Sequence, residues 1–440
     1  MSKPSLQLPV IQNWSCHNCG GCCREHLIEI TEAEKTRIEK QGWAADKDLK
    51  TDKPLIETIG KGRYRLAHQA DGACVFLNDD GLCRIHAKFG EPAKPLACRV
   101  YPYAYHPAGE EAITVSLRFS CPSVVQNLGQ SVSAQSGDLN SVAKEIVAGK
   151  RRDHDAPLIH RNPKHGNQQT SWSDFHQFLK TLDDSFADTS VDFVVRLMRA
   201  ISWMELVEES QFVTIKDAKL TEFLSLISKA SVKAQPDNDL PVHRPSRLGR
   251  TMFRLMAGQL ARHDTEADYQ RGLGLRFELL SAALKYTTGW GKVPQLAGSS
   301  SVATAFGDGT GSGKSRAVGF AELEHPFDGR QPEIDELFER YFRVKIQGIH
   351  FCGPAHYDTP LVDGFRSLAL MYPVVMWLAR LRAARGGRTS LSLTDVQAAL
   401  ATADHNFGYS PALGMSSALG RVAQLGKLKQ VTALVGWYSQ

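Results

Sequence analysis

Apolar residues recur at helical spacing along most of the chain after residue 172. In five segments they stand three or four positions apart, as on one face of an amphipathic helix: 191–209, 220–230, 247–263, 334–346 and 361–383. Aromatic residues on these faces are expected to fill the core between the helices. The pattern therefore predicts a mainly α-helical domain over residues 173–440.

The first 130 residues have a different pattern. Residues 113–119 alternate strictly between apolar and polar side chains, which predicts a strand with one buried face. Thr31 and Glu34 have the spacing of a capping box, which predicts a helix over about 32–41. Short loops and turns fill the rest, so we expect a small, irregular domain here. The whole chain is therefore predicted to be an α+β protein.

Length and composition divide the chain further. At 440 residues it is longer than one hydrophobic core usually serves, so we predict a separate amino-terminal domain over residues 1–130. Residues 131–172 are polar and basic, which predicts a linker. Within the helical domain, the Pro-rich residues 235–246 and the Gly/Ser-rich residues 296–319 predict flexible segments.

Charge and hydropathy limit the classes of partner. The net charge of +5 is spread along the chain and is too small to predict nucleic-acid binding. The amino-terminal residues lack the apolar run of a secretory signal. The longest apolar stretch, Leu368–Ala379, contains Pro373 and is shorter than the roughly 20 residues of a transmembrane helix. We therefore predict a cytoplasmic protein without a membrane span.

The cysteines carry the strongest chemical signal. Cys352 stands alone, whereas the other eight of the nine cysteines lie in the first 121 residues: Cys16, Cys19, Cys22, Cys23, Cys74, Cys83, Cys98 and Cys121. Cytosolic thiols stay reduced, so this clustering indicates metal binding rather than disulfides. All eight are therefore predicted metal ligands, in a cysteine-cluster metal-binding domain.

The spacing of these cysteines explains how they could meet. In "CHNCGGCC", residues 16–23, two residues separate successive cysteines, and the two glycines allow a tight turn. Residues 79–81, "DDG", predict a turn that brings Cys74 and Cys83 together in a hairpin-like loop. The spacing suits zinc and three corners of a [4Fe–4S] cluster equally. Eight thiolates could form two four-cysteine sites, or one cluster with further thiols beside it, so metal and partition stay open.

Charged residues and histidines near the cysteines add candidates. Arg24, Arg84 and Arg99 each follow a cysteine directly. Guanidinium groups at these positions would offset the negative charge of a thiolate site. Among the histidines of the region, His86 is the best candidate for an additional ligand, because it lies three residues after Cys83.

The ordered set of motifs resembles a known family. C-x2-C-x2-C-C, then "CVFLNDDGLCRIH", "KPLACRVYPY" and "FSCP" resemble the YkgJ-type cysteine-cluster family, which is described as zinc- or iron-chelating and includes the flagellin lysine N-methylases. The likeness covers residues 14–125. Nearer the C-terminus, "YFRVKIQGIHFCG" and "TDVQAALATADHNFGYSPAL" resemble the helical tail of those methylases.

The resemblance implies an enzyme. A member of the methylase group would use S-adenosylmethionine, contain an iron–sulfur centre and act on a protein substrate. The resemblance assigns no catalytic and no cofactor-binding residue to this chain, so those residues stay unknown.

A glycine-rich stretch at 307–315, "GDGTGSGKS", suggests two nucleotide-binding alternatives. A phosphate-binding loop needs glycine at the position of Asp308, and it should follow a strand and open a helix, which the flanking sequence does not predict. A methyltransferase glycine turn needs a helix and a second strand before an acidic residue. Glu322 follows Gly311 too closely for both elements, so a flexible loop is favoured.

Three functional hypotheses follow. The first is a protein with structural zinc, which does no chemistry because a closed four-cysteine site leaves no open position on the ion. The second is a protein-lysine N-methyltransferase, whose substrate lysine must lose its proton before it attacks a methyl group. Asp404 and His405 are the polar pair that could assist, although the end of a helix explains them more simply. The third is metal delivery or storage.

Overall fold

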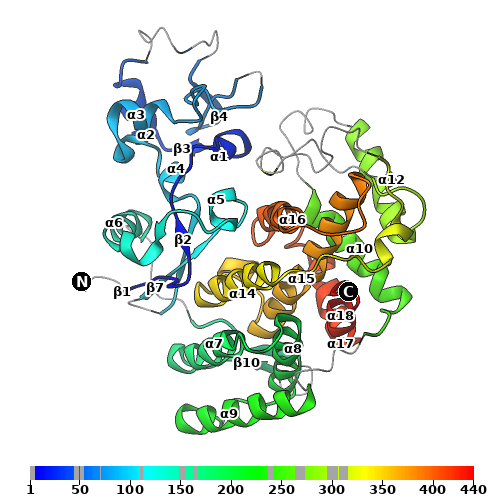
Figure 1. Ribbon diagram of the computed structural model, residues 1–440. Helices are drawn as coiled ribbons and strands as arrows, with labels where there is room; N and C mark the ends of the chain where they lie inside the picture. Colours follow the sequence, from blue (N-terminus) through cyan, green and yellow to red (C-terminus); the bar gives the residue numbers. More distant parts are fainter. Residues whose placement is uncertain are drawn as a thin grey trace.

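The computed structural model describes residues 5–43, 49, 54–69, 71–109, 112–147, 155–162, 166–235, 242–262, 273–294, 306 and 316–440. The predicted α+β fold class is confirmed, because a part with small sheets precedes a helical part (Figure 1). Most of the two segments predicted to be flexible, 235–246 and 296–319, lies outside the described residues.

Small sheets organise the amino-terminal part. Within the described residues the strands are β1 (Ser5–Gln7), β2 (Asn13–Trp14), β3 (Glu29–Ile30), β4 (Ile56–Gly60), β5 (Arg63–Leu66), β6 (Tyr103–Pro107), β7 (Ala112–Leu117), β8 (Gln130–Ser131), β9 (His160–Asn162) and β10 (Gly166–Gln168). β7 lies between β1, which is parallel to it, and β6, which is antiparallel. β5 lies between β3 and β4, antiparallel to both. β2 pairs with β8 and β9 with β10, both antiparallel.

Short helices connect these strands: α1 (Gly21–Glu25), α2 (Glu32–Glu39), α3 (Arg84–Phe89), α4 (Leu96–Val100), α5 (Pro122–Val125) and α6 (Ser136–Val147). The predicted capping box begins α2. The Thr31 side chain accepts a hydrogen bond from the Glu34 backbone at 3.3 Å, and the Glu34 carboxylate accepts from the Thr31 backbone at 2.8 Å. The division of the chain at residues 130 and 172 stays a prediction, since α6, β9 and β10 lie between those positions.

Longer helices form the rest: α7 (Trp172–Ala187), α8 (Phe193–Glu208), α9 (Asp217–Ala234), α10 (Arg247–Ala261), α12 (Leu273–Thr288), α14 (Pro332–Gln347), α15 (Leu361–Arg385), α16 (Leu393–Asn406), α17 (Ser416–Lys427) and α18 (Gln430–Tyr438). α8, α9, α10, α14 and α15 confirm the five helices predicted from periodicity. Figure 1 shows α14 between the sheet of β7 and the remaining helices.

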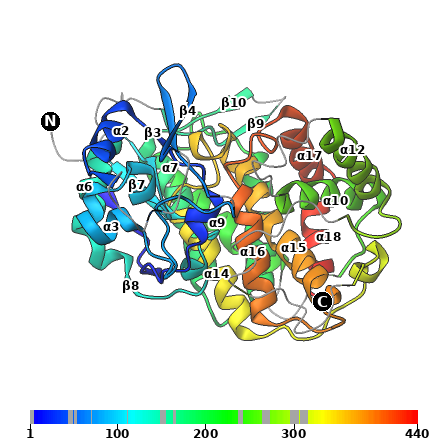
Figure 2. The same cartoon turned by 90° about the horizontal axis from the view of Figure 1, so that it is seen from above.

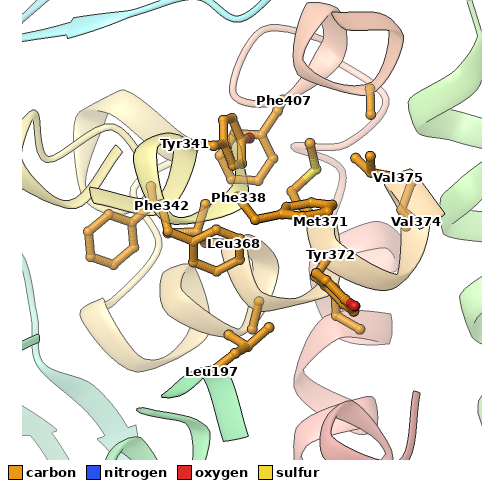
Figure 3. Close-up of a cluster of buried hydrophobic side chains, with 14 of the residues drawn as sticks. Leu197, Phe338, Tyr341, Phe342, Leu368, Met371, Tyr372, Val374, Val375 and Phe407 are labelled. Carbon is orange, nitrogen blue, oxygen red and sulfur yellow. The ribbon is translucent and has the colours of Figure 1, made fainter. Parts of the chain in front are cut away.

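Two hydrophobic clusters lie in the described chain. The larger runs from β7 into the helices, and Figure 3 shows part of it, where Phe338 of α14 lies near Met371 and Tyr372 of α15. The smaller is confined to the amino-terminal part and contains Ile30, Ile38, Leu66, Phe76 and Ile85. The cysteine-bearing segments therefore have a small core of their own.

The strand β7 departs from its prediction. Its alternation predicted one buried face, yet Thr114 and Ser116, on the polar face, are also buried. The reason is α14, which covers that face. The Thr114 hydroxyl donates to the carbonyl oxygen of Gly348 at 3.0 Å, just beyond the end of α14. Hydroxyl groups on a strand are compatible with burial when such acceptors are present.

The apolar stretch around Pro373 lies inside the predicted helix, which is longer than the stretch itself. It is part of α15, which continues through the proline for 25 residues. Among the described helices α15 alone is long and apolar enough to cross a membrane, but 89% of its most apolar window is buried inside the protein. A buried core helix meets the same criteria, so this feature is weak support for a membrane span.

Truncating Phe342 should destabilise the protein by about 3–5 kcal/mol, the usual cost of Phe→Ala in a core. Its side chain is fully buried, with ring centroids 5.4 Å from Phe186 and 5.3 Å from Phe193. The matched control is Phe277→Ala in α12, where the side chain is 71% exposed. Urea unfolding measures both, and equal losses in the two variants would contradict this assignment of the core.

Candidate functional site

Two cysteine-bearing segments cross in the amino-terminal part. α1 carries Cys22 and Cys23, and the carbonyl oxygen of Cys23 accepts a hydrogen bond from the backbone N–H of Cys74 at 2.8 Å. Before α1, Gly20 has φ 67°, and a β-carbon there would lie 3.3 Å from the Leu77 side chain. The left-handed backbone and the close neighbour both favour glycine. The predicted tight turn is therefore confirmed.

The loop between Cys74 and Cys83 folds back on itself. Leu77 pairs with Cys83 in an antiparallel bridge. Gly81 at the tip has φ 76°, and a side chain there would collide with the carbonyl oxygen of Asn18. The predicted hairpin-like loop is confirmed, and its tip rests against the turn of the first C-x2-C motif.

The eight clustered cysteines differ in exposure. Cys74 and Cys121 are buried, Cys16 and Cys19 are exposed, and four are intermediate: Cys22, Cys23, Cys83 and Cys98. All nine cysteines of the chain are described, and none forms a disulfide. Within the described residues, no three His, Cys, Asp or Glu side chains are grouped so that they could hold a metal ion. The structure thus brings reduced cysteine segments together without closing a ligand cage.

Several of these thiols lie near one another. Burial, together with the neighbouring Cys83 and Cys22 thiols, raises the pKa of Cys74 to about 12. Burial also raises the pKa of Cys98, with smaller contributions from Cys74 and Cys83. A thiolate in such surroundings needs a cation beside it. The donor set therefore fits a thiophilic metal such as zinc or iron.

The charged neighbours of the cysteines have other partners. Arg24 lies 2.8 Å from Asp71, and Arg99 lies 3.0 Å from Glu91 and 2.8 Å from Glu145. Carboxylates thus offset these guanidinium charges, and the predicted role in balancing thiolate charge finds no support at the two positions. His86, the proposed additional ligand, is exposed on α3.

A second polar site is buried where α14, α16 and the end of β7 meet. Nζ of Lys345 lies 2.7 Å from Oδ1 of Asp404, and both side chains are 0% exposed. The ammonium group also donates to the carbonyl oxygen of Leu117 at 3.2 Å, and it lies 3.2 Å from Nδ1 of His350. Burial lowers the pKa of Lys345, and Asp404 opposes that shift. We infer that the lysine is charged, because its three N–H groups meet three acceptors.

Asp404 has two further donors. The Tyr341 hydroxyl donates to Oδ1 at 3.1 Å, and the Ser120 backbone N–H donates to Oδ2 at 3.2 Å. Burial, followed by the Asp404 charge, raises the pKa of Tyr341 well above its usual value, so this hydroxyl keeps its proton. Ser120 directly precedes Cys121 in the chain, which joins the ion pair to the last cysteine motif.

Neutral histidines border the ion pair. Burial, followed by the charge of Lys345, lowers the pKa of His356 to about 3 and that of His350 well below its usual value. Because an ammonium group only donates, Nδ1 of His350 accepts and its proton is on Nε2. That Nε2 and Nδ1 of His356 each lie 3.7 Å from where a β-carbon on Gly408 would stand. No described protein group pairs with either nitrogen.

A surface pocket lies on one side of this network. Its lining includes His106, Asp155, Trp172, Ile349 and Cys352. The ring of His106 is 4.8 Å from the ring of His350, so it stands between the pocket and the buried ion pair.

α1 and α16 bring the cysteines and the ion pair close together. Nδ1 of His405 lies 3.7 Å from Oε2 of Glu25, and its ring stacks on His26 with centroids 5.7 Å apart. Figure 2 shows α1 beside α16. Asp404 and His405, the pair nominated from sequence, stand at the end of α16 as expected, but their side chains have different partners. The sequence did not predict Lys345 as the partner of Asp404 or Glu25 as the partner of His405.

Comparison with known proteins agrees with this geometry. Residues 15–122 match the model of the CxxCxxCC family, described as "Putative zinc- or iron-chelating domain". The predicted resemblance to a cysteine-cluster family is confirmed. The match contains all eight clustered cysteines.

Relatives with curated names match over a limited length. Proteins named "Lysine-N-methylase" in Salmonella choleraesuis (strain SC-B67) and Salmonella typhimurium (strain LT2) are each 29% identical over 133 residues. These matches cover 27% of this chain and 30% of each relative. "Flagellar biosynthetic protein FliU" of Salmonella muenchen is 28% identical over 27% of this chain and 72% of that protein. No solved structure matches the chain.

Breaking the buried ion pair should be costly. Asp404→Asn leaves the Lys345 ammonium without a counter-charge, so we expect a loss of about 3–5 kcal/mol in the free energy of unfolding. The double variant Lys345→Met/Asp404→Leu removes both charges and should lose less than the two single variants, Lys345→Met and Asp404→Leu, added together. Denaturant unfolding at neutral pH measures all four. Simple additivity would show that the two side chains do not interact.

Proposed function

We propose that this chain is a metal-binding cysteine-cluster protein, holding zinc or an iron–sulfur cluster, and that it is a protein lysine N-methylase using S-adenosylmethionine in the cytoplasm. The observation that carries the metal site is the crossing of two cysteine segments, with the Cys74 N–H bonded to the Cys23 carbonyl. The family match over residues 15–122 supports the same site. A reducing compartment is the one in which eight free thiols would persist.

A zinc or iron site needs several sulfur ligands close to one another. The chain supplies thiols from α1, from the loop 74–83, from α4 and from the start of α5. When bound, zinc would supply structural order, and an iron–sulfur cluster could also supply redox chemistry. The small size of the amino-terminal core favours dependence on such an ion, because metal-binding free energy then becomes folding free energy.

The methylase function is supported by the relatives named lysine-N-methylase, which this chain matches over 30% of their length. In such a reaction the lysine amine gives its lone pair to the methyl carbon, and the carbon–sulfur bond breaks toward the sulfonium. S-adenosylhomocysteine leaves as a neutral thioether, and the amine nitrogen loses one proton. Because only the neutral amine has a lone pair to give, the site must remove the proton of a lysine ammonium.

The pocket beside His106 has room for about one water molecule, so a substrate lysine could bring its amine to the pocket but not bury its methylene groups there. Pro107, Pro157 and Trp172 give the pocket apolar walls, and Asp155 places a carboxylate at the same pocket. An ammonium group is attracted by that carboxylate, and the carboxylate can take its proton. We therefore assign Asp155 as the candidate proton acceptor.

A non-catalytic role in metal binding or delivery is the second candidate. It is favoured by the exposure of Cys16 and Cys19 and by the lack of a closed three-ligand group among the described residues. Exposed thiols can pass an ion to a partner, whereas a closed structural zinc site cannot.

Metal analysis tests the first part. The full chain purified without oxygen should contain zinc or iron. With iron–sulfur it should be brown and lose colour when oxidised, whereas with zinc it should be colourless. Elemental analysis per mole of chain measures the content. Material with neither metal would contradict the proposed metal site.

Methyl transfer tests the second part. The full chain with S-adenosylmethionine carrying a labelled methyl group should label lysines of flagellin, and Asp155→Asn should reduce the rate at least tenfold. The matched control is Asp138→Asn, an exposed acid on α6, which should keep the rate. Labelling is read by mass spectrometry of the product. Absence of labelling with metal-loaded protein would favour the non-catalytic role.

A further inference from the structure

We propose that the start of α10 and the junction of α17 and α18 form a basic surface that binds an acidic segment of a partner protein. Its cations have no carboxylate partner among the described residues: Arg244, Arg247, Arg250, Arg421, Lys427 and Lys429. None of them belongs to the cysteine segments, the buried ion pair or the pocket lining. This role is therefore separate from metal binding and from methyl transfer.

Two stretches of sequence supply the basic surface, and neither contains an acidic residue. Residues 242–262 and residues 406–440 carry arginine or lysine but no Asp or Glu. The chain has 52 basic and 47 acidic residues, and eight of the basic ones lie in these two stretches, so the rest of the chain has a small net negative charge. The excess positive charge is therefore concentrated here, although the whole sequence suggested an even spread.

The fold brings the two stretches together. The Ser246 backbone N–H donates to Oε1 of Gln430 at 2.8 Å, and a β-carbon on Gly249 would collide with the same side chain. The start of α10 thus lies against the start of α18, and Figure 2 shows α10, α17 and α18 side by side. Arg247 directly follows Ser246 and Lys429 directly precedes Gln430, so cations from both stretches share one surface.

Most of these cations are available to an anion. Four of them are exposed: Arg244, Arg247, Lys427 and Lys429. Arg250 is partly buried, and its Nε has no hydrogen-bond partner among the described groups. A carboxylate can accept two hydrogen bonds at once from the fork of a guanidinium group. The side chains of Asp and Glu therefore match this surface in geometry as well as in charge.

The neighbouring helix α8 does not neutralise the basic surface. The charges of Lys427 and Lys429 act on Glu208 and Glu205 of α8. Glu208, however, lies 2.5 Å from Arg366. Neither glutamate forms an ion pair with the two lysines. The positive charge of the lysines thus stays available to a partner.

The ends of two helices add to the positive potential. α10 and α18 begin at this surface, and neither has an acidic residue in its first turn. The start of a helix carries a partial positive charge, which acidic side chains usually offset. In α10 two arginines, Arg247 and Arg250, stand in that turn instead. An anion from outside the chain would relieve this repulsion.

Exposed apolar side chains favour a protein as the partner. Leu248 is 57% exposed and Leu428 is 43% exposed, and both stand next to cations of the basic surface. The phosphate backbone of a nucleic acid offers leucine no apolar contact. Membrane surfaces favour aromatic anchors, but Trp437 is only partly exposed and lies beside Arg244 at 5.9 Å. A peptide segment supplies carboxylates and apolar side chains together.

Fluorescence anisotropy tests this surface with a labelled peptide of about 20 residues in which leucines stand among glutamates. The full chain should bind the peptide, and raising the salt from about 50 to about 300 mM should weaken binding about tenfold or more, because exposed charges are screened. Lys427→Glu/Lys429→Glu should weaken binding by about tenfold or more at low salt. The matched control is Lys219→Glu/Lys229→Glu, at two exposed lysines of α9, which changes the net charge equally and should keep the affinity.

Arg247→Glu separates binding from stability. A carboxylate suits the start of α10, so the urea midpoint should stay level or rise, while the affinity for the peptide should fall about threefold or more. No binding to wild type, or an equal loss in the α9 control, would overturn the docking surface. Tighter binding to vesicles with phosphatidylserine or to single-stranded DNA than to the peptide would overturn the choice of a protein partner. Far-UV circular dichroism checks that each variant keeps its helices.

Discussion

The buried ion pair between Lys345 and Asp404 is the interaction on which the arrangement of the two parts depends. Both charges are fully removed from water, so each is tolerable only while the other is present. The pair joins α14 to α16, and the Ser120 and Leu117 backbones add the end of β7 to the same network. The sheet and the helices must therefore adopt one relative position, because only then does each buried charge meet its partner.

The cysteine segments are organised differently. Their hydrophobic cluster is small, and the loops around it approach one another at glycines, such as Gly20 and Gly81, where a side chain has no room. Such loops hold the sulfurs near one another, but they do not close a cage among the described residues. The contact of His405 with Glu25 and His26 then places this region directly against the end of α16.

Local patterns in the sequence predicted much of the fold. The helical periods of α8, α10, α14 and α15 and the capping box of Thr31 depend on neighbouring residues, so they can be read from the chain. The cysteine loops were likewise predictable from the spacing of Cys74 and Cys83 and from the glycines at their turns. Burial of both faces of β7 was not, because it depends on α14, which is more than 200 residues away.

The buried polar network could be predicted only in part for the same reason. Asp404 was nominated with His405 as a polar pair, although the end of a helix would explain both residues more simply. Lys345 lies on an ordinary amphipathic helix, where a lysine is expected to face solvent. Its partners Asp404 and Leu117 come from distant parts of the chain. Burial of the long helix α15 could not be predicted either, because length and apolar composition are the same for a core helix and for a membrane span.

The environment of Arg380 has a consequence for the order in which the chain can fold during synthesis. This arginine lies in the apolar helix α15, is fully buried, and donates to the carbonyl oxygens of Leu323, His325, Tyr438 and Gln440. Two of those acceptors lie 58 and 60 residues after Arg380 in the chain, so they are synthesised after α15. Until they emerge, the Arg380 guanidinium lacks two of its acceptors and cannot be buried. The apolar surface of α15 then stays exposed to water, where chaperones or other nascent chains can bind it.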